Sequence, residues 1–132
     1  MDNIKLYGYN ILIAEDNDIN YFLLRELINH TRANCYRAIN GLEAINIVSR
    51  LKNISLILMD INMPVMDGIS ATRKIREKNI SVPIVFQTAY DSNETREECI
   101  KAGGTDFLSK PINFDKLYTV LKKYLKKVYI PL

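Results

Sequence analysis

The chain has 132 residues, of which 48% are hydrophobic, and a net charge of +3, which fits one globular domain with a substantial core. The small net charge gives no sign of a nucleic-acid-binding protein, and no apolar stretch approaches the roughly 20 residues of a membrane-spanning helix. The N-terminus lacks the layout of a secretory signal, so we expect a cytoplasmic location.

The first apolar run covers residues 10–14 and is followed by two acids, Glu15 and Asp16. A run of this length and composition predicts a buried strand. A helix should follow it, because apolar residues recur at helical spacing and share one face. These residues are Ile19, Phe22, Leu23 and Leu27.

The second and third strands are expected at residues 35–39 and 54–59, and the third delivers Asp60 to the edge of the sheet. Asn40 and Glu43 have the spacing of a helix cap with an acid three residues later, which predicts a helix between these two strands. Its apolar positions are Ile45, Val48 and Leu51, and those of the next helix are Ile69, Thr72 and Ile75.

The fourth strand is expected at residues 82–87. Asp91 predicts the start of the next helix, and Gly103 predicts its end, since glycine tolerates a left-handed cap. The fifth strand is expected at residues 105–109. The last helix is expected to begin at the capping residue Asn113. Its apolar stripe consists of Phe114, Leu117, Tyr118, Leu121 and Leu125.

Five strand-helix repeats in one short chain predict the α/β class, a parallel sheet with helices on both faces that is either flavodoxin-like or Rossmann-like. We place the domain at residues 9–128, between an N-terminal extension at 1–8 and a C-terminal tail at 129–132. Cys35 and Cys99 lack the paired spacing of a metal site and are expected to be buried thiols.

In such a sheet, ligand sites lie outside the carboxyl ends of the strands. Five polar side chains follow these ends and are therefore candidates for one pocket. Three are acids, one is a hydroxyl and one is an ammonium, a combination that indicates metal-assisted phosphoryl chemistry. They are Glu15, Asp16, Asp60, Thr88 and Lys110.

Four motifs occur in order along the chain: Ile11-Leu-Ile-Ala-Glu-Asp-Asn, Met59-Asp-Ile-Asn-Met-Pro-Val-Met-Asp-Gly, Gln87-Thr-Ala and Phe107-Leu-Ser-Lys-Pro. With these motifs, residues 10–126 resemble the receiver domain of two-component response regulators, and most of all the receivers attached to hybrid sensor histidine kinases. The resemblance implies a flavodoxin-like sheet of strand order 2-1-3-4-5 and a cis peptide bond before Pro111. It also implies a cytoplasmic phosphorelay component, which can be part of a membrane sensor kinase.

The resemblance further implies that Asp60 is the phosphorylated nucleophile and that Mg²⁺ is the cofactor. Because Mg²⁺ prefers oxygen ligands and retains water, we expect Asp16 and Asp60 to bind it directly and Glu15 to bind it through water. The backbone carbonyl of Asn62 is the remaining expected ligand. The ion would also relieve the repulsion among the three carboxylates.

Lys110 is expected to neutralise the phosphoryl oxygens, and Thr88 is expected to donate a hydrogen bond to them. Phosphorylation would then draw Thr88 inward, let Phe107 turn, and alter the face formed by the fourth helix, fifth strand and fifth helix. Phe107 stands where the family often has tyrosine. Tyr90 is expected to shield the phosphoryl group from water.

The expected partner is a histidine kinase or a histidine phosphotransfer protein, with no direct contact of this domain to nucleic acid or membrane; the oligomeric state stays open. The isolated domain would catalyse only its own phosphorylation and dephosphorylation, whereas a parent chain could be a hybrid histidine kinase. The alternative is a receiver-like binding module that is never phosphorylated. A dehalogenase-type phosphatase is disfavoured, because it needs a second acid where Asn62 stands.

Overall fold

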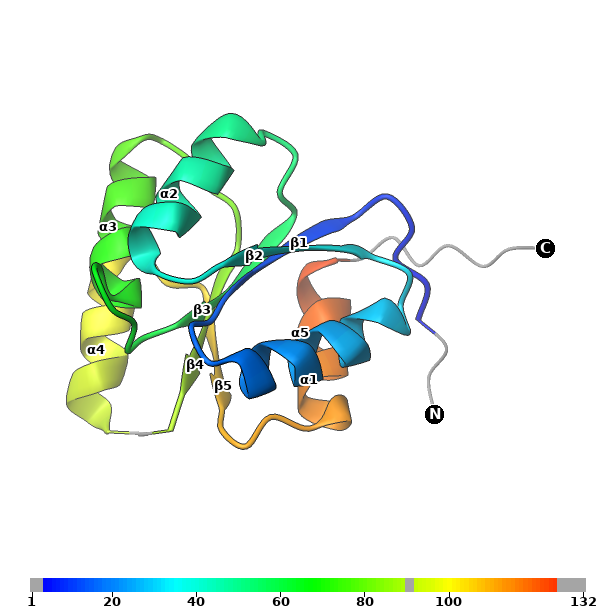
Figure 1. Cartoon of the computed structure of the whole chain (residues 1–132). Helices are drawn as coiled ribbons and strands as arrows, with labels where there is room; N and C mark the ends of the chain where they lie inside the picture. Colours follow the sequence, from blue (N-terminus) through cyan, green and yellow to red (C-terminus); the bar gives the residue numbers. More distant parts are fainter. Residues whose placement is uncertain (1–3, 90–91, 126–132) are drawn as a thin grey trace.

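Strands and helices alternate through the whole computed structural model, which describes residues 4–89 and 92–125 (Figure 1). The strands are β1 (Asn10–Ala14), β2 (Asn34–Ala38), β3 (Leu56–Asp60), β4 (Ile84–Thr88) and β5 (Asp106–Ser109). The helices are α1 (Asp18–Asn29), α2 (Gly41–Arg50), α3 (Gly68–Glu77), α4 (Asn93–Ala102) and α5 (Phe114–Tyr124). The predicted C-terminal tail lies outside the described residues.

The five strands form one parallel sheet in the order β2-β1-β3-β4-β5. Both the α/β class and the strand order implied by the resemblance are therefore confirmed. Every residue of β1, β3 and β4 is buried, because helices cover both faces of a parallel sheet. The registers pair Ala14 with Met59, Asp60 with Gln87, and Thr88 with Ser109. The carboxyl ends of neighbouring strands therefore lie close to one another.

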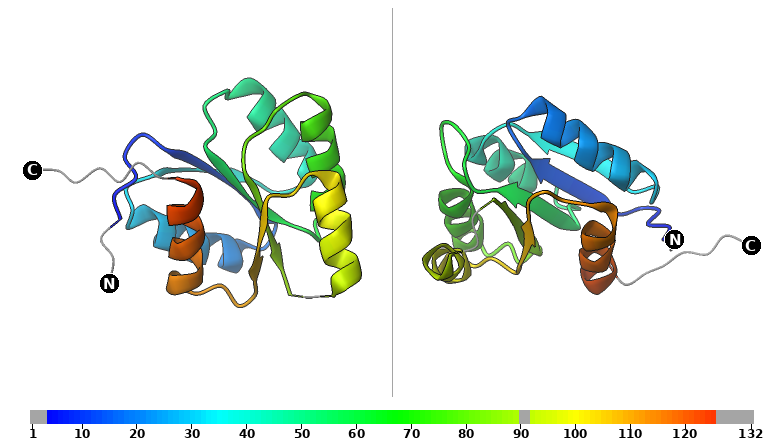
Figure 2. Two further views of the ribbon diagram at one scale, coloured as in Figure 1. Left: turned by 180° about the vertical axis from the view of Figure 1, so that it is seen from behind. Right: turned by 90° about the horizontal axis from the view of Figure 1, so that it is seen from below.

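Two helical layers enclose the sheet, and Figure 2 shows the sheet between them. Helices α1 and α5 supply the apolar side chains of one core, which includes Leu24, Ile28 and Leu117. Helices α2, α3 and α4 supply those of the other core, which includes Phe86 of β4. Alternate residues of the central strands point into opposite cores. Packing in both cores therefore fixes the central strands, whose carboxyl ends carry the acids.

The buried face of α1 differs from the predicted one. Three of the four predicted residues, Ile19, Phe22 and Leu23, are 77%, 49% and 51% exposed. The fourth, Leu27, is half-buried against the core, so the predicted face is not the one that packs most closely against the sheet. This helix is apolar on most of its sides, and two stripes have helical spacing, so periodicity alone cannot choose between them. The stripe that packs against the sheet consists of Tyr21, Leu24 and Ile28.

Side-chain caps begin the helices largely as predicted. Asn40 accepts from the amide of Glu43 at 2.8 Å, and the Glu43 carboxylate accepts from a backbone amide in return. Ser92, rather than Asp91, is the N-cap of α4; Asp91 lies outside the described residues. Gly103 ends α4 with a φ of 107°, a left-handed conformation that favours glycine.

The segment before β1 packs into the core. Ile4 and Leu6 are buried, and the Leu6 amide donates to the Thr31 carbonyl at 2.6 Å. The domain boundary at residue 9 remains a prediction. This segment and the end of α5 lie on the same side of the molecule, near the amino ends of the strands (Figure 1). Within the described ranges, no helix combines the length and apolar character required to cross a membrane.

Adjacent leucines of α1 should respond very differently to truncation. Leu24 is 2% exposed, so Leu24→Ala should leave a cavity and lower the free energy of unfolding by about 2–5 kcal/mol. Leu23→Ala, at a half-exposed position, should lower it by about 0.5 kcal/mol or less. Urea denaturation of both variants measures the difference. A larger loss in Leu23→Ala than in Leu24→Ala would show that α1 packs on the face that the sequence pattern favoured.

Candidate functional site

Three carboxylates meet at the carboxyl ends of β1 and β3. Glu15 and Asp16 directly follow β1, and Asp60 is the last residue of β3. One carboxylate oxygen from each residue lies within 4.8 Å of those of the other two. Glu15 and Asp60 are buried, whereas Asp16 is exposed. The structure thus brings together the three acids that were predicted from the strand ends.

Lys110 reaches this acid cluster from the segment after β5. Its Nζ lies 3.2 Å from Oδ1 of Asp60 and 3.5 Å from Oε1 of Glu15. The Lys110-Pro111 peptide bond is cis, as the resemblance implied. One ammonium among three carboxylates leaves the cluster acidic when all are ionised. The site therefore still favours a further cation.

The pKa of Glu15 is shifted by the burial of its carboxyl and by its charged neighbours. Burial, and after it the adjacent Asp60 carboxyl, raises the pKa of Glu15 from 4.5 to about 7, although Lys110 acts in the opposite direction. A divalent cation at these oxygens would favour the ionised carboxylate. Three carboxylates within reach of one another are hard oxygen donors of the kind that Mg²⁺ prefers. The residues present therefore fit this ion.

Arg37 of β2 holds the acid-bearing turn, and the sequence analysis missed it. Its Nε donates to the carbonyl of Glu15 at 3.2 Å, and its Nη2 donates to the carbonyl of Asp16 at 3.4 Å. The guanidinium also pairs with Asp18 at 2.8 Å and lies 4.3 Å from the centroid of the Tyr21 ring. The available sequence signal was a cation one residue before the end of a short strand.

The loop after Asp60 folds back against that residue. A side chain at position 68 would collide with the backbone carbonyl oxygen of Asp60, so Gly68 permits the close approach. Asp67 fixes the start of α3 by accepting from the amide of Ser70 at 2.7 Å. Asn62 is exposed in this loop. Its role as a carbonyl ligand remains a prediction.

The two predicted switch residues lie on β4 and β5. Thr88 is buried at the end of β4, next to the strand that carries Asp60. The half-buried Phe107 ring lies 6.3 Å from the Phe86 ring in a stacked arrangement, and the Arg96 guanidinium covers it at 4.7 Å. Tyr90 lies outside the described residues.

Sequence comparison identifies the family to which this arrangement belongs. The profile of the response regulator receiver domain matches residues 11–122. The chain belongs to this family. Sensor histidine kinase RcsC of Salmonella typhi is 35% identical to the receiver domain over 118 residues, which are 89% of this chain and 12% of RcsC. Transcriptional regulatory protein ZraR of Klebsiella oxytoca is 38% identical over 116 residues, 88% of this chain and 26% of ZraR.

The receiver domain therefore spans only a minor part of the length of these curated relatives. Two of the solved structures match it over nearly their whole length. The receiver domain of sensor histidine kinase PA1611 from Pseudomonas aeruginosa PAO1, with a magnesium ion in its active site cleft, is 34% identical with a TM-score of 0.82; the match covers 91% of this chain and 99% of that one.

A second solved structure contains a receiver domain together with a partner. It is the complex of the Saccharomyces cerevisiae histidine phosphotransfer signaling protein Ypd1 with the receiver domain of Ssk1. The identity is 30% and the TM-score is 0.85, over 96% of this chain and 92% of that one. The fold of this receiver domain is therefore shared with receivers of bacteria and yeast.

The raised pKa of Glu15 should make the metal-free domain less stable as the pH rises. The folded protein binds more protons than the unfolded chain between pH 4.5 and about 7, so this carboxyl lowers the free energy of unfolding across that interval. Urea denaturation in the presence of a chelator measures this effect. As the pH rises from 4.5 to about 7, the free energy of unfolding of Glu15→Gln should fall by roughly 1–3 kcal/mol less than that of wild type.

The matched control is the exposed Glu77 at the end of α3. Glu77→Gln should follow the wild-type dependence on pH. If Glu15→Gln followed it as well, the pKa of Glu15 would not be raised on folding.

Proposed function

We propose that Asp60 of this receiver domain accepts a phosphoryl group from a phosphohistidine. The observation that carries the proposal is the placement of Asp60, whose carboxylate ends a central strand within 3.2 Å of the Lys110 ammonium and beside two further acids. A carboxylate is a weak nucleophile, so it needs a phosphoryl group whose negative charge is neutralised. The Lys110 ammonium, together with a bound divalent cation, would meet that need.

Mg²⁺ is the proposed cofactor, and Asp16, Asp60, Glu15 through water, and the carbonyl of Asn62 are the proposed ligands. The acidic donor set supports this assignment, and the PA1611 receiver contains magnesium in its active site cleft. When bound, the ion would supply positive charge to the phosphoryl oxygens. It would also favour the ionised form of Glu15, whose pKa is raised by burial and, after that, by the adjacent Asp60 carboxyl.

Each remaining residue has a defined task in the transfer. A carboxylate oxygen of Asp60 forms the new bond to phosphorus while the bond between phosphorus and the donor imidazole nitrogen breaks. Lys110 places its ammonium against the phosphoryl oxygens, and the Thr88 hydroxyl donates a hydrogen bond to one of them. In the same proposal, Tyr90 limits the access of water to the product. The domain then catalyses only its own phosphorylation and dephosphorylation.

The proposed partner is a histidine kinase or a histidine phosphotransfer protein. Similarity to the sensor histidine kinase RcsC supports the first class, and the complex of Ypd1 with the Ssk1 receiver supports the second. Nothing in this proposal requires the domain to contact nucleic acid or a membrane. The partner would deliver its phosphohistidine to the acid cluster at the carboxyl edge of the sheet.

Intact mass spectrometry tests the acceptor. Wild-type protein incubated with acetyl phosphate and Mg²⁺ should gain roughly 80 Da, the mass of one phosphoryl group. Asp60→Asn should gain nothing, because an amide lacks the nucleophilic oxygen, and excess chelator should prevent the gain in wild type.

The matched control is Asp67→Asn, which removes a nearby acid outside the cluster and retains a side chain that caps helices well. This variant should be phosphorylated like wild type. A gain that survives in Asp60→Asn would place the acceptor elsewhere. Absence of any gain, also with phosphorylated Ypd1 as donor, would favour a binding module that is never phosphorylated.

We also propose that phosphorylation is transmitted through Thr88 to Phe107 and so to the face formed by α4, β5 and α5. Phe107 lies between the buried Phe86 and the Arg96 guanidinium, so rotation of its ring would change what α4 packs against. The buried Thr88 is on the adjacent strand, and β4 pairs with β5. In this proposal, a new charge at Asp60 shifts the equilibrium between two arrangements of the Thr88 and Phe107 side chains.

NMR of the aromatic side chains tests this coupling. Phosphorylation should shift the ring resonances of Phe107 in wild type, and Thr88→Ala should lose at least half of that shift while Asp60 is still modified. Ser81→Ala, at an exposed position before β4 and outside this face, should retain the full shift. An undiminished shift in Thr88→Ala would show that the signal bypasses this hydroxyl.

A further inference from the structure

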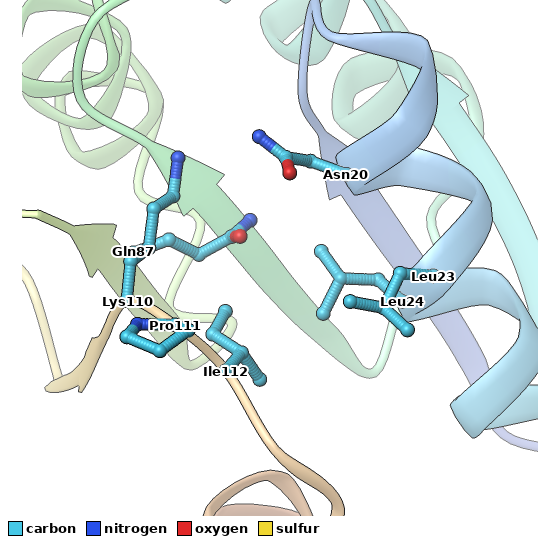
Figure 3. A pocket seen from close by; sticks show the side chains of 7 residues that line it. All are labelled: Asn20, Leu23, Leu24, Gln87, Lys110, Pro111 and Ile112. Carbon is cyan, nitrogen blue, oxygen red and sulfur yellow. The ribbon is translucent and has the colours of Figure 1, made fainter.

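A pocket separate from the acids lies between α1 and the segment after β5 (Figure 3). Leu23 and Leu24 form one wall, and Pro111 and Ile112 form the opposite one. The stem of Lys110 also lines it, while the ammonium of that residue contacts Asp60 and Glu15. The pocket thus borders the acid cluster but is apolar on most of its surface.

The size of this pocket suits a small organic molecule. Its volume is about 370 Å³, which is near the lower end of the range for ligand sites. An apolar cavity of about 150 Å³ holds one benzene molecule. The pocket therefore has room for a compact ligand about twice that size.

One polar group in this pocket lacks a partner. The side chain of Gln87 is completely buried, and neither its Oε1 nor its Nε2 has a hydrogen-bond partner among the described residues. Figure 3 shows the carboxamide directed across the pocket toward α1. A buried amide without partners destabilises the folded state unless something in the pocket pairs with it. A ligand in this pocket should therefore accept a hydrogen bond from Nε2 of Gln87 and donate one to its Oε1.

We propose that this pocket binds a small neutral ligand with an apolar body and one carboxamide end. A carboxamide presents an acceptor and a donor side by side, so it can pair with both atoms of Gln87 at once. An anionic or a cationic end would lose its hydration in a pocket that is apolar on most of its surface, where the ammonium of Lys110 already contacts Asp60 and Glu15. Both are less suited to the pocket than a neutral group of the same shape.

Titration of the 132-residue, ¹⁵N-labelled, metal-free protein with cyclohexanecarboxamide tests this proposal. The side-chain amide of Gln87 and the backbone amides of Leu24 and Ile112 should shift and saturate. Gln87→Leu should weaken binding by about tenfold or more, because two hydrogen bonds are lost. Gln87→Met, a second variant without the amide, should do the same, and Ile19→Ala, on the exposed side of α1, should bind like wild type.

The charged isostere cyclohexanecarboxylate completes the experiment, and it should bind at least about tenfold more weakly than the amide. Absence of a saturable shift would overturn the proposal and assign the pairing of Gln87 to water alone. Unchanged binding by the two Gln87 variants, or tighter binding of the carboxylate, would overturn it as well. The titration contains neither Mg²⁺ nor a phosphoryl donor, so its outcome is independent of whether Asp60 is phosphorylated.

Discussion

The contact of the Lys110 ammonium with the buried carboxylates of Asp60 and Glu15 is the interaction on which the site depends. Two acids that are largely removed from water and close to each other strongly disfavour full ionisation, and the raised pKa of Glu15 is the direct sign of this. The lysine offsets part of the repulsion. The remaining demand for positive charge favours a divalent cation at the cluster, which the proposed phosphoryl transfer requires.

Such a cluster persists only when its surroundings hold the charges in place. Arg37 fixes the backbone that carries Glu15 and Asp16, and Gly68 lets the following loop pack directly against the carbonyl of Asp60. These contacts involve backbone atoms, so they set the positions of the acids without competing for the carboxylate oxygens. The side chains remain available for ligands because the main chain is anchored by other means.

The parts of the structure that follow from local pattern could be predicted from the sequence. The apolar runs located the strands, and their last residues located Asp60, Thr88 and Lys110, because parallel strands end at a common edge. The strand order rested on the resemblance. Periodicity failed in α1, where apolar residues occupy most sides and the buried stripe is chosen by tertiary packing. Arg37 could not be assigned its task, since its contacts join residues distant in sequence.

The two ends of the described chain have a consequence for how this domain can be connected to other molecules. The segment before β1 and the end of α5 lie near the amino ends of the strands, whereas Asp60 and Lys110 lie at the carboxyl ends. The described chain therefore begins and ends on the side of the molecule opposite the acids. The domain can be tethered to a surface, or to a larger protein, with its reactive edge facing outward.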